Sequence, residues 1–216
     1  MPYFNIVAET SENTVVTEYE PVKKRSDSYQ SEAELEQGFI RLLCEQGYEY
    51  LPIHTEKDLI ANLRKKLEEL NNYRFSDTEW EDFFKNAVAN PNEHIVEKTR
   101  KIQEDNVQVL TRDDGSSKNI TLIDKKNIHN NRLQVINQYV IGTEDGAKHD
   151  NRYDVTVLVN GLPLVHIELK RRGVAIREAF NQINRYQRDS FWAGCGLYEY
   201  SDFRNFKWNK YKVLFQ

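Results

Sequence analysis

The stretch that decides the fold runs from Arg152 to Tyr186 and reads RYDVTVLVNGLPLVHIELKRRGVAIREAFNQINRY. Residues 153–159 are rich in Val and Thr, and residues 162–170 alternate between apolar and polar types. Two β-type runs separated by Asn-Gly are the strongest short-range signal for a hairpin. The stretch therefore predicts a strand, a tight turn, a second strand and then a helix.

Three charged residues lie at the open end of this predicted hairpin: Asp154, Glu168 and Lys170. Glu168 and Lys170 are two residues apart on one strand, so they project from the same face. A regular two-residue loop would place Asp154 opposite Ile167, and the two carboxylates would then point to opposite faces. We therefore predict a loop of odd length or a bulge near 160–163, where a proline that cannot donate a ladder hydrogen bond suits a bulge.

Two carboxylates and a lysine on one face suit a hard divalent cation and phosphodiester chemistry. Mg²⁺ prefers oxygen ligands and is usually held by one or two carboxylates together with substrate phosphates. The plainer alternative is a surface strand on which Glu168 and Lys170 form a weak ion pair. The spacing of the three residues is common by chance, so it does not decide between these readings.

The surrounding sequence resembles the PD-(D/E)xK nuclease superfamily, with Asp154, Glu168 and Lys170 at its three catalytic positions. Tyr153 stands where the usual motif has proline. Gln182 and Tyr186 on the following helix resemble the Gln-x-x-x-Tyr signature of RecB-type nucleases. These two residues are four apart and share one helix face.

The sequence VNGLPLVHIELK, followed by an expected helix and by RDSFWAGCGLYEY, resembles the N-terminal nuclease domain of the restriction (R) subunit of type I restriction–modification enzymes. The resemblance runs from about Ser31 to Tyr200. It implies an endonuclease that hydrolyses DNA phosphodiesters with Mg²⁺. It also implies modification and specificity subunits as partners, and ATP use only by the full-length subunit, because this chain has no G-x-x-x-x-G-K-[ST] phosphate loop.

The resemblance also implies a role for each site residue. Asp154, Glu168 and the backbone carbonyl of Leu169 hold the metal, and Lys170 orients and activates the water and stabilises developing charge. Gln182 and Tyr186 are expected to support the lysine or to hold the phosphate. Glu36 is a candidate for a further metal ligand. The residues expected to bind DNA are Arg171, Arg172 and Arg185. For Glu36 and the arginines, a solvated helix face is the open alternative.

The expected fold class is α/β: a mixed sheet flanked by helices, with a restriction-endonuclease-like core. Capping motifs at Ser31, Thr55 and Ser76 predict three helices, and a fourth is expected over 93–102. Strands are expected within 13–19, in a hairpin from Asn106 onward, and over 133–141. The expected domain division is an N-terminal extension (1–30), a helical segment (31–105), the nuclease core (106–200) and a C-terminal tail (201–216).

Two side-chain patterns accompany these elements. The first helix is expected to bury Leu35, Phe39, Leu42 and Leu43. On the strand over 133–141, strict alternation predicts Asn137 and Tyr139 on one face and Ile136 and Gln138 on the other.

Composition sets limits on the remaining functions. The net charge is −4 and charged residues make up 30% of the chain, which is typical of a soluble globular protein. No apolar run is long enough to span a bilayer, and the two cysteines, Cys44 and Cys195, are expected to be reduced thiols. These features predict a cytoplasmic protein with no membrane association.

Several alternatives stay open at this stage. The chain could be a catalytically idle domain that docks partner subunits, or a nuclease that acts on RNA or DNA ends. The loop over 144–150 carries acidic residues and His149, and we interpret it as a solvated loop rather than a metal site. His166 is expected to be packed within the protein rather than to contact substrate. The basic and aromatic tail does not match the strand expected of the family, and a packed terminal element is favoured there over nucleic-acid binding.

Overall fold

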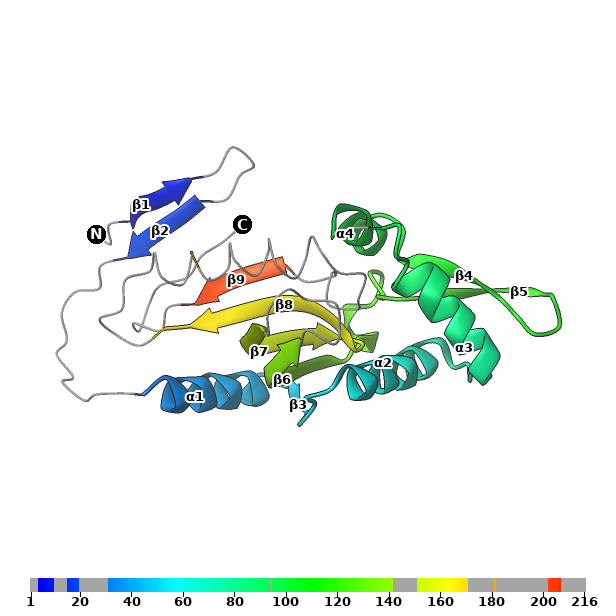
Figure 1. Cartoon of the computed structure of the whole chain (residues 1–216), viewed down its shortest axis with the longest axis horizontal. Coiled ribbons are helices and arrows are strands. Elements are labelled where there is room, and N and C mark those ends of the chain that lie inside the picture. Colours follow the sequence, from blue (N-terminus) through cyan, green and yellow to red (C-terminus); the bar gives the residue numbers. More distant parts are fainter. Residues whose placement is uncertain are drawn as a thin grey trace.

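The computed structural model describes residues 4–9, 15–19, 31–93, 95–141, 151–170, 181 and 202–206. Its centre is a five-stranded sheet in the order β3-β6-β7-β8-β9 (Figure 1). The strands are β3 (Glu49–Tyr50), β6 (Leu133–Ile141), β7 (Asn151–Val159), β8 (Leu162–Leu169) and β9 (Asp202–Phe206). The three central strands are antiparallel, and each outer strand runs parallel to its neighbour. The prediction of an α/β fold with a mixed sheet is confirmed.

Two small hairpins accompany the sheet. One pairs β1 (Phe4–Glu9) with β2 (Val15–Tyr19), and the other pairs β4 (Val107–Thr111) with β5 (Ser117–Thr121). The strand within 13–19 and the hairpin after Asn106 are confirmed. Strand β1 was not predicted from the sequence. The tail does contain a strand at 202–206, because β9 pairs with β8, although its sequence did not match the strand expected of the family.

The helices begin where the capping residues predict. Ser31 caps α1 (Glu32–Glu45), Thr55 caps α2 (Glu56–Asn71) and Ser76 caps α3 (Asp77–Phe83), each by accepting a backbone hydrogen bond through its side chain. A π-helical turn, η1 (Phe84–Val88), continues α3, and α4 covers Ile95–Gln103. A short 3₁₀ turn, η2 (Ile128–Asn130), precedes β6.

The sheet has a separate hydrophobic cluster on each face. Helix α1 contributes Leu35, Phe39 and Leu43 to the smaller cluster, which includes Val135 and Ile167 of the sheet. Leu42 remains 36% exposed, so the expectation that it is buried is wrong. The larger cluster joins α2 and α3 to the other face. Its sheet members are Ile136, Tyr139, Tyr153, Leu158 and Leu162.

The turn between β7 and β8 is fixed from two sides. Asn160 and Gly161 have φ of 52° and 84°, as a type I′ turn requires. The buried Asn160 side chain donates to the carbonyl oxygen of Leu122 at 3.0 Å and accepts from the backbone N–H of Arg132 at 2.8 Å. On the other side, Gly161 lies against the backbone of Leu63 in α2. The turn therefore packs between α2 and the segment that leads into β6.

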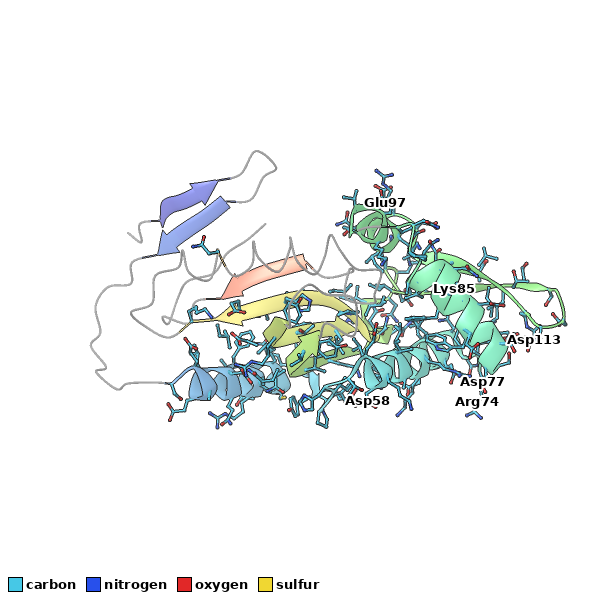
Figure 2. All side chains as sticks on the ribbon, viewed as in Figure 1. Asp58, Arg74, Asp77, Lys85, Glu97 and Asp113 are labelled. Carbon is cyan, nitrogen blue, oxygen red and sulfur yellow. The ribbon has the colours of Figure 1, made fainter. Side chains whose placement is uncertain are left out.

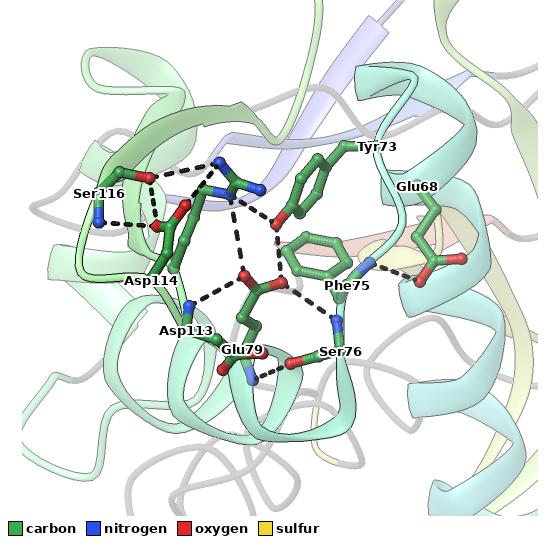
Figure 3. Close-up of polar contacts among 9 residues, drawn as sticks. Glu68, Tyr73, Phe75, Ser76, Glu79, Asp113, Asp114 and Ser116 are labelled. Atoms are coloured by element: carbon green, nitrogen blue, oxygen red, sulfur yellow. Dashed lines mark hydrogen bonds and ion pairs between the residues drawn. The ribbon is translucent and has the colours of Figure 1, made fainter.

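A buried glutamate joins α3 to the β4–β5 hairpin (Figure 3). Glu79 accepts hydrogen bonds from the Tyr73 hydroxyl at 2.7 Å and from the backbone N–H groups of Ser76 and Asp113 at 3.1 and 3.2 Å. Burial opposes ionisation, but these donors and the nearby Arg112 charge outweigh it, so the pKa of Glu79 is lowered. Its carboxylate therefore fixes the hairpin to the helices at the end of the molecule away from α1 (Figure 1).

Charged side chains occupy the outside of the helical part. Asp58, Lys85 and Asp113 are exposed and point away from the core (Figure 2). Among the residues that the structure describes, no helix is long and apolar enough to cross a bilayer. Cys44 is exposed and forms no disulfide, while Cys195 lies outside the described residues.

Gly161→Ala tests the packing of the turn on α2. A Cβ at this position would lie 2.6 Å from the Leu63 Cα, in addition to adopting a left-handed φ. We expect a loss of about 2–4 kcal/mol in the free energy of unfolding, measured by urea denaturation. Gly115→Ala is the matched control, because its φ is +79° but no atom lies within 4 Å of the added Cβ. An equal loss in both variants would show that the contact with Leu63 is unimportant.

Candidate active site

A β-bulge sets the register of the β7–β8 hairpin. Next to the turn, Val159 pairs with Leu162 and Leu158 with Pro163, but Val157 pairs with Val165. Leu164 is therefore the extra residue on β8. The bulge predicted near 160–163 is confirmed, and the loop itself has two residues.

The bulge determines which residue faces Asp154. Beyond it, Thr156 pairs with His166 and Val155 with Ile167, so the next residue of each strand places Asp154 across from Glu168. Without the extra residue, Asp154 would face Ile167 and the two carboxylates would point to opposite faces. One inserted residue therefore turns two separate acids into a pair.

Short polar contacts join the three predicted catalytic residues to the end of β8. The Asp154 Oδ2 accepts from the backbone N–H of Leu169 at 2.8 Å. The Lys170 ammonium donates to the Glu168 Oε1 at 2.5 Å, and both side chains are largely excluded from solvent. The structure thus brings together two carboxylates, one ammonium and the backbone of Leu169.

The two acids carry more negative charge than their surroundings neutralise. Burial raises the pKa of Glu168 to about 7, and the Asp154 charge adds to this rise while Lys170 opposes it. Burial also raises the pKa of Asp154, with the charges of Glu36 and Glu32 adding and the Leu169 and Lys170 contacts opposing. For Lys170, burial opposes the charged form, but Glu168 and Asp154 outweigh it and raise the pKa. A cation would therefore be stabilised between these acids.

Glu36 on α1 is held by two neighbouring residues of β6. The Asn137 Nδ2 donates to its Oε1 at 2.6 Å, and the Gln138 Nε2 donates to its Oε2. Gln138 has φ of +51°, which is rare for a residue with a side chain and costs about 1–3 kcal/mol. Sequence reasoning missed both amides as site residues. Their only signal was a pair of adjacent polar residues in a strand where polar residues otherwise stand alone.

The left-handed conformation of Gln138 also reverses the faces of β6. Val135 and Ile136 lie in different clusters, as alternation predicts, but Tyr139 packs in the same cluster as Ile136. The prediction that Tyr139 shares a face with Asn137 is therefore wrong. The physical reason is that a positive φ interrupts the pleat on which alternation depends.

His166 is part of the packing rather than of the charged cluster. Its Nδ1 lies 2.8 Å from the Thr156 Oγ1, and its ring stacks on Tyr153 with centroids 4.5 Å apart. Burial lowers the pKa of His166 to about 3, so the ring is neutral at pH 7. The expectation that His166 is packed is confirmed.

The donor set fits a cation that needs few protein ligands. Within 31–93, 95–141 and 151–170, no three His, Cys, Asp or Glu side chains are grouped to hold a metal ion. Two carboxylates and a backbone carbonyl next to them suit Mg²⁺, which retains several waters. The structure does not describe the loop over 144–150 or the remaining predicted site residues, which are Gln182, Tyr186, Arg171, Arg172 and Arg185.

A mixed sheet whose bulged hairpin places an Asp, a Glu and a Lys together defines a restriction-endonuclease-like fold. Residues 29–215 match the family described as "Type I restriction enzyme R protein N terminus", and this chain belongs to that family. The match includes most of the tail, so the expectation that 201–216 depart from the family pattern is wrong.

Similar proteins are named as endonuclease subunits of type I restriction enzymes. The chain is 49% identical over 195 residues to the type I restriction enzyme EcoprrI endonuclease subunit of Escherichia coli, covering 90% of this chain and 61% of that subunit. It is 38% identical over 177 residues to the SsaAORF53P endonuclease subunit of Staphylococcus saprophyticus, covering 80% of this chain and 18% of that subunit. A third relative is the HindI endonuclease subunit of Haemophilus influenzae, 30% identical over 179 residues, with 73% of this chain and 17% of the subunit covered. The chain thus spans only part of these relatives.

The pKa of Glu168 predicts how stability depends on pH. In the unfolded chain this group has a pKa of 4.5, and in the folded chain about 7. The folded state therefore binds the proton more tightly, and stability falls as the pH rises between these values, by on the order of 3 kcal/mol. The raised pKa of Asp154 acts in the same direction.

The test measures the free energy of unfolding of the unmodified chain and of Glu168→Gln from pH 4.5, the pKa of Glu168 in the unfolded chain, to pH 8. The variant should lose the part of the pH dependence that Glu168 contributes, and so become the more stable chain at high pH. Glu81→Gln on the exposed side of α3 is the control and should follow the unmodified chain. Parallel curves for all three chains would contradict the assigned pKa.

Proposed function

We propose that this chain is the nuclease portion of a type I restriction enzyme R subunit and cleaves DNA phosphodiesters with Mg²⁺. The observation that carries this proposal is the bulged hairpin, which sets Asp154 across from Glu168 with Lys170 bound to Glu168. Membership of the R-protein N-terminal family and the names of the relatives support it.

Each site residue has a proposed role in binding the cation. Asp154, Glu168 and the backbone carbonyl of Leu169 would hold the cation, and Glu36 would add charge or a further ligand. When bound, the cation would lower the pKa of a water and neutralise charge on a phosphoryl oxygen. The burial and the like negative charges of the two acids would favour a positive ion over a neutral ligand.

Lys170 acts as a cation rather than as a base. Its pKa is raised by Glu168 and Asp154 despite its burial, so it stays protonated at neutral pH and cannot take a proton from water. In hydrolysis, the water oxygen forms a bond to phosphorus and releases its proton to bulk water, while the bond from phosphorus to the leaving oxygen breaks and that oxygen takes up a proton from bulk water. Lys170 would orient the attacking water and stabilise the charge that develops on the phosphoryl oxygens.

Residues beyond the described hairpin complete the proposal. Gln182 and Tyr186 would support Lys170 or hold the scissile phosphate, and Arg171, Arg172 and Arg185 would bind the DNA backbone. The modification and specificity subunits would bring sequence recognition, and ATP would act only in the full-length subunit. We place this assembly in the cytoplasm.

Metal binding tests the acid pair directly. Calorimetry with Mn²⁺ or Mg²⁺ should show one site in the unmodified chain and a loss of affinity of at least about tenfold in both Asp154→Ala and Glu168→Ala. Glu81→Ala is the matched acidic control, since that side chain is exposed on α3. Equal affinity in all four chains would favour a catalytically idle docking domain.

Lys170→Ala separates metal binding from cleavage. We expect this variant to bind Mn²⁺ at least as tightly as the unmodified chain, because a competing positive charge has been removed. When assembled with the other subunits, it should cleave circular DNA about 100-fold more slowly. Linear DNA and RNA in the same assay separate an endonuclease from an end-directed or RNA nuclease. Unchanged cleavage by Lys170→Ala would overturn the role given to the lysine.

A further inference from the structure

The Glu36 carboxylate has one side-chain amide donor for each of its oxygens. Asn137 donates to Oε1 at 2.6 Å and Gln138 donates to Oε2. The two donors are consecutive residues of β6, whereas Glu36 belongs to α1, about a hundred residues earlier in the chain. Glu36 itself is only 8% exposed.

A regular strand could not make this pair of contacts. Successive side chains of a strand point to opposite faces, so residues 137 and 138 would reach different sides of the sheet. The φ of +51° at Gln138 removes this restriction and lets both amides reach one carboxylate. The left-handed backbone is thus the condition for the double contact.

The distortion lies at the position of the acid pair. Asn137 pairs with Val155 and Tyr139 with Tyr153, so Gln138 falls directly across from Asp154. On the other side of β7, Asp154 faces Glu168. The strained residue, Asp154 and Glu168 therefore lie in one row across three neighbouring strands, and the hydrogen bond from Gln138 brings the Glu36 carboxylate to the end of this row.

A third contact fixes the orientation of the Asn137 amide. The Tyr50 hydroxyl donates to the Asn137 Oδ1 at 2.9 Å, which leaves the Nδ2 to face Glu36. Tyr50 belongs to β3, which runs parallel to β6. The carboxylate is therefore held through β3 and β6 as well as by its own helix.

We propose that Asn137 and Gln138 are positioning residues that hold the Glu36 carboxylate in the row of Asp154 and Glu168, as a fixed negative charge next to the cation site rather than as a third grouped ligand. This inference rests on the proposed function. It explains why a strand tolerates an unfavourable backbone conformation at the one position across from Asp154. A purely structural tie between α1 and the sheet would need only one of the two contacts and no left-handed residue.

Two substitutions at residue 138 separate positioning from stability. Gln138→Gly and Gln138→Ala both remove the amide, but only glycine accepts a φ of +51° without strain. The alanine variant should therefore melt about 2–4 °C below the glycine variant. Both should bind Mn²⁺ about tenfold more weakly than the unmodified chain, and by the same factor. Metal affinity would then follow the side chain, and melting temperature the backbone.

Glu36→Gln supplies the second part of the experiment, because it removes the charge while keeping the shape. It should weaken Mn²⁺ binding by about the same tenfold factor. The double variant Glu36→Gln with Gln138→Gly should bind no more weakly than Glu36→Gln alone, since positioning has no value without the charge. Gln108→Gly in β4 is the control for a glutamine-to-glycine change in a strand and should leave affinity unchanged.

The outcomes distinguish the two proposals. If Asp154→Ala weakens Mn²⁺ binding but Gln138→Gly does not, the positioning role is overturned and the nuclease proposal stands. Additive losses in the double variant also overturn it, because Gln138 would then act independently of Glu36. If the unmodified chain binds no metal, or Asp154→Ala has no effect, the cation site fails and this inference fails with it.

Discussion

One extra residue in β8 is the constraint on which the candidate site depends. The bulge around Leu164 shifts the pairing of β7 and β8, so that Asp154 faces Glu168 instead of Ile167. The shift holds because the turn before it cannot move: Asn160 is hydrogen-bonded to the chain before β6, and Gly161 lies against α2. Helix α2 thus contributes to the site by fixing a turn rather than by supplying a ligand.

The site concentrates charge where water is scarce. Glu168 is buried beside Asp154, and among the residues that the structure describes Lys170 is the cation bound to it. Placing like charges together in a region of low dielectric is unfavourable, so such a cluster destabilises the folded chain until a cation neutralises it. Gln138 adds backbone strain at the same row of residues. Strain and unneutralised charge at one place are typical of functional sites.

Local signals in the sequence predicted most elements correctly. Side-chain caps at Ser31, Thr55 and Ser76 mark helix starts because each contact lies within one turn. Errors arose where a pattern was extended through an exception. Alternation placed Tyr139 on the wrong face because Gln138 is left-handed. The basic and aromatic composition of the tail did not predict β9, which forms a strand because the edge of β8 is available for pairing.

The sequence by itself determined the hairpin, its Asn-Gly turn, and the need for a bulge if Asp154 and Glu168 are to share a face. All of these follow from residues within about twenty positions of one another, where spacing and backbone preference are sufficient. The choice of Asp154, Glu168 and Lys170 as a site came from the family resemblance and stays a prediction. Only the tertiary structure decided that α1 places Glu36 against Asn137 and Gln138, and that α2 fixes the turn through Leu63. Contacts between elements so far apart in the chain depend on how the elements pack, and no local pattern records that packing.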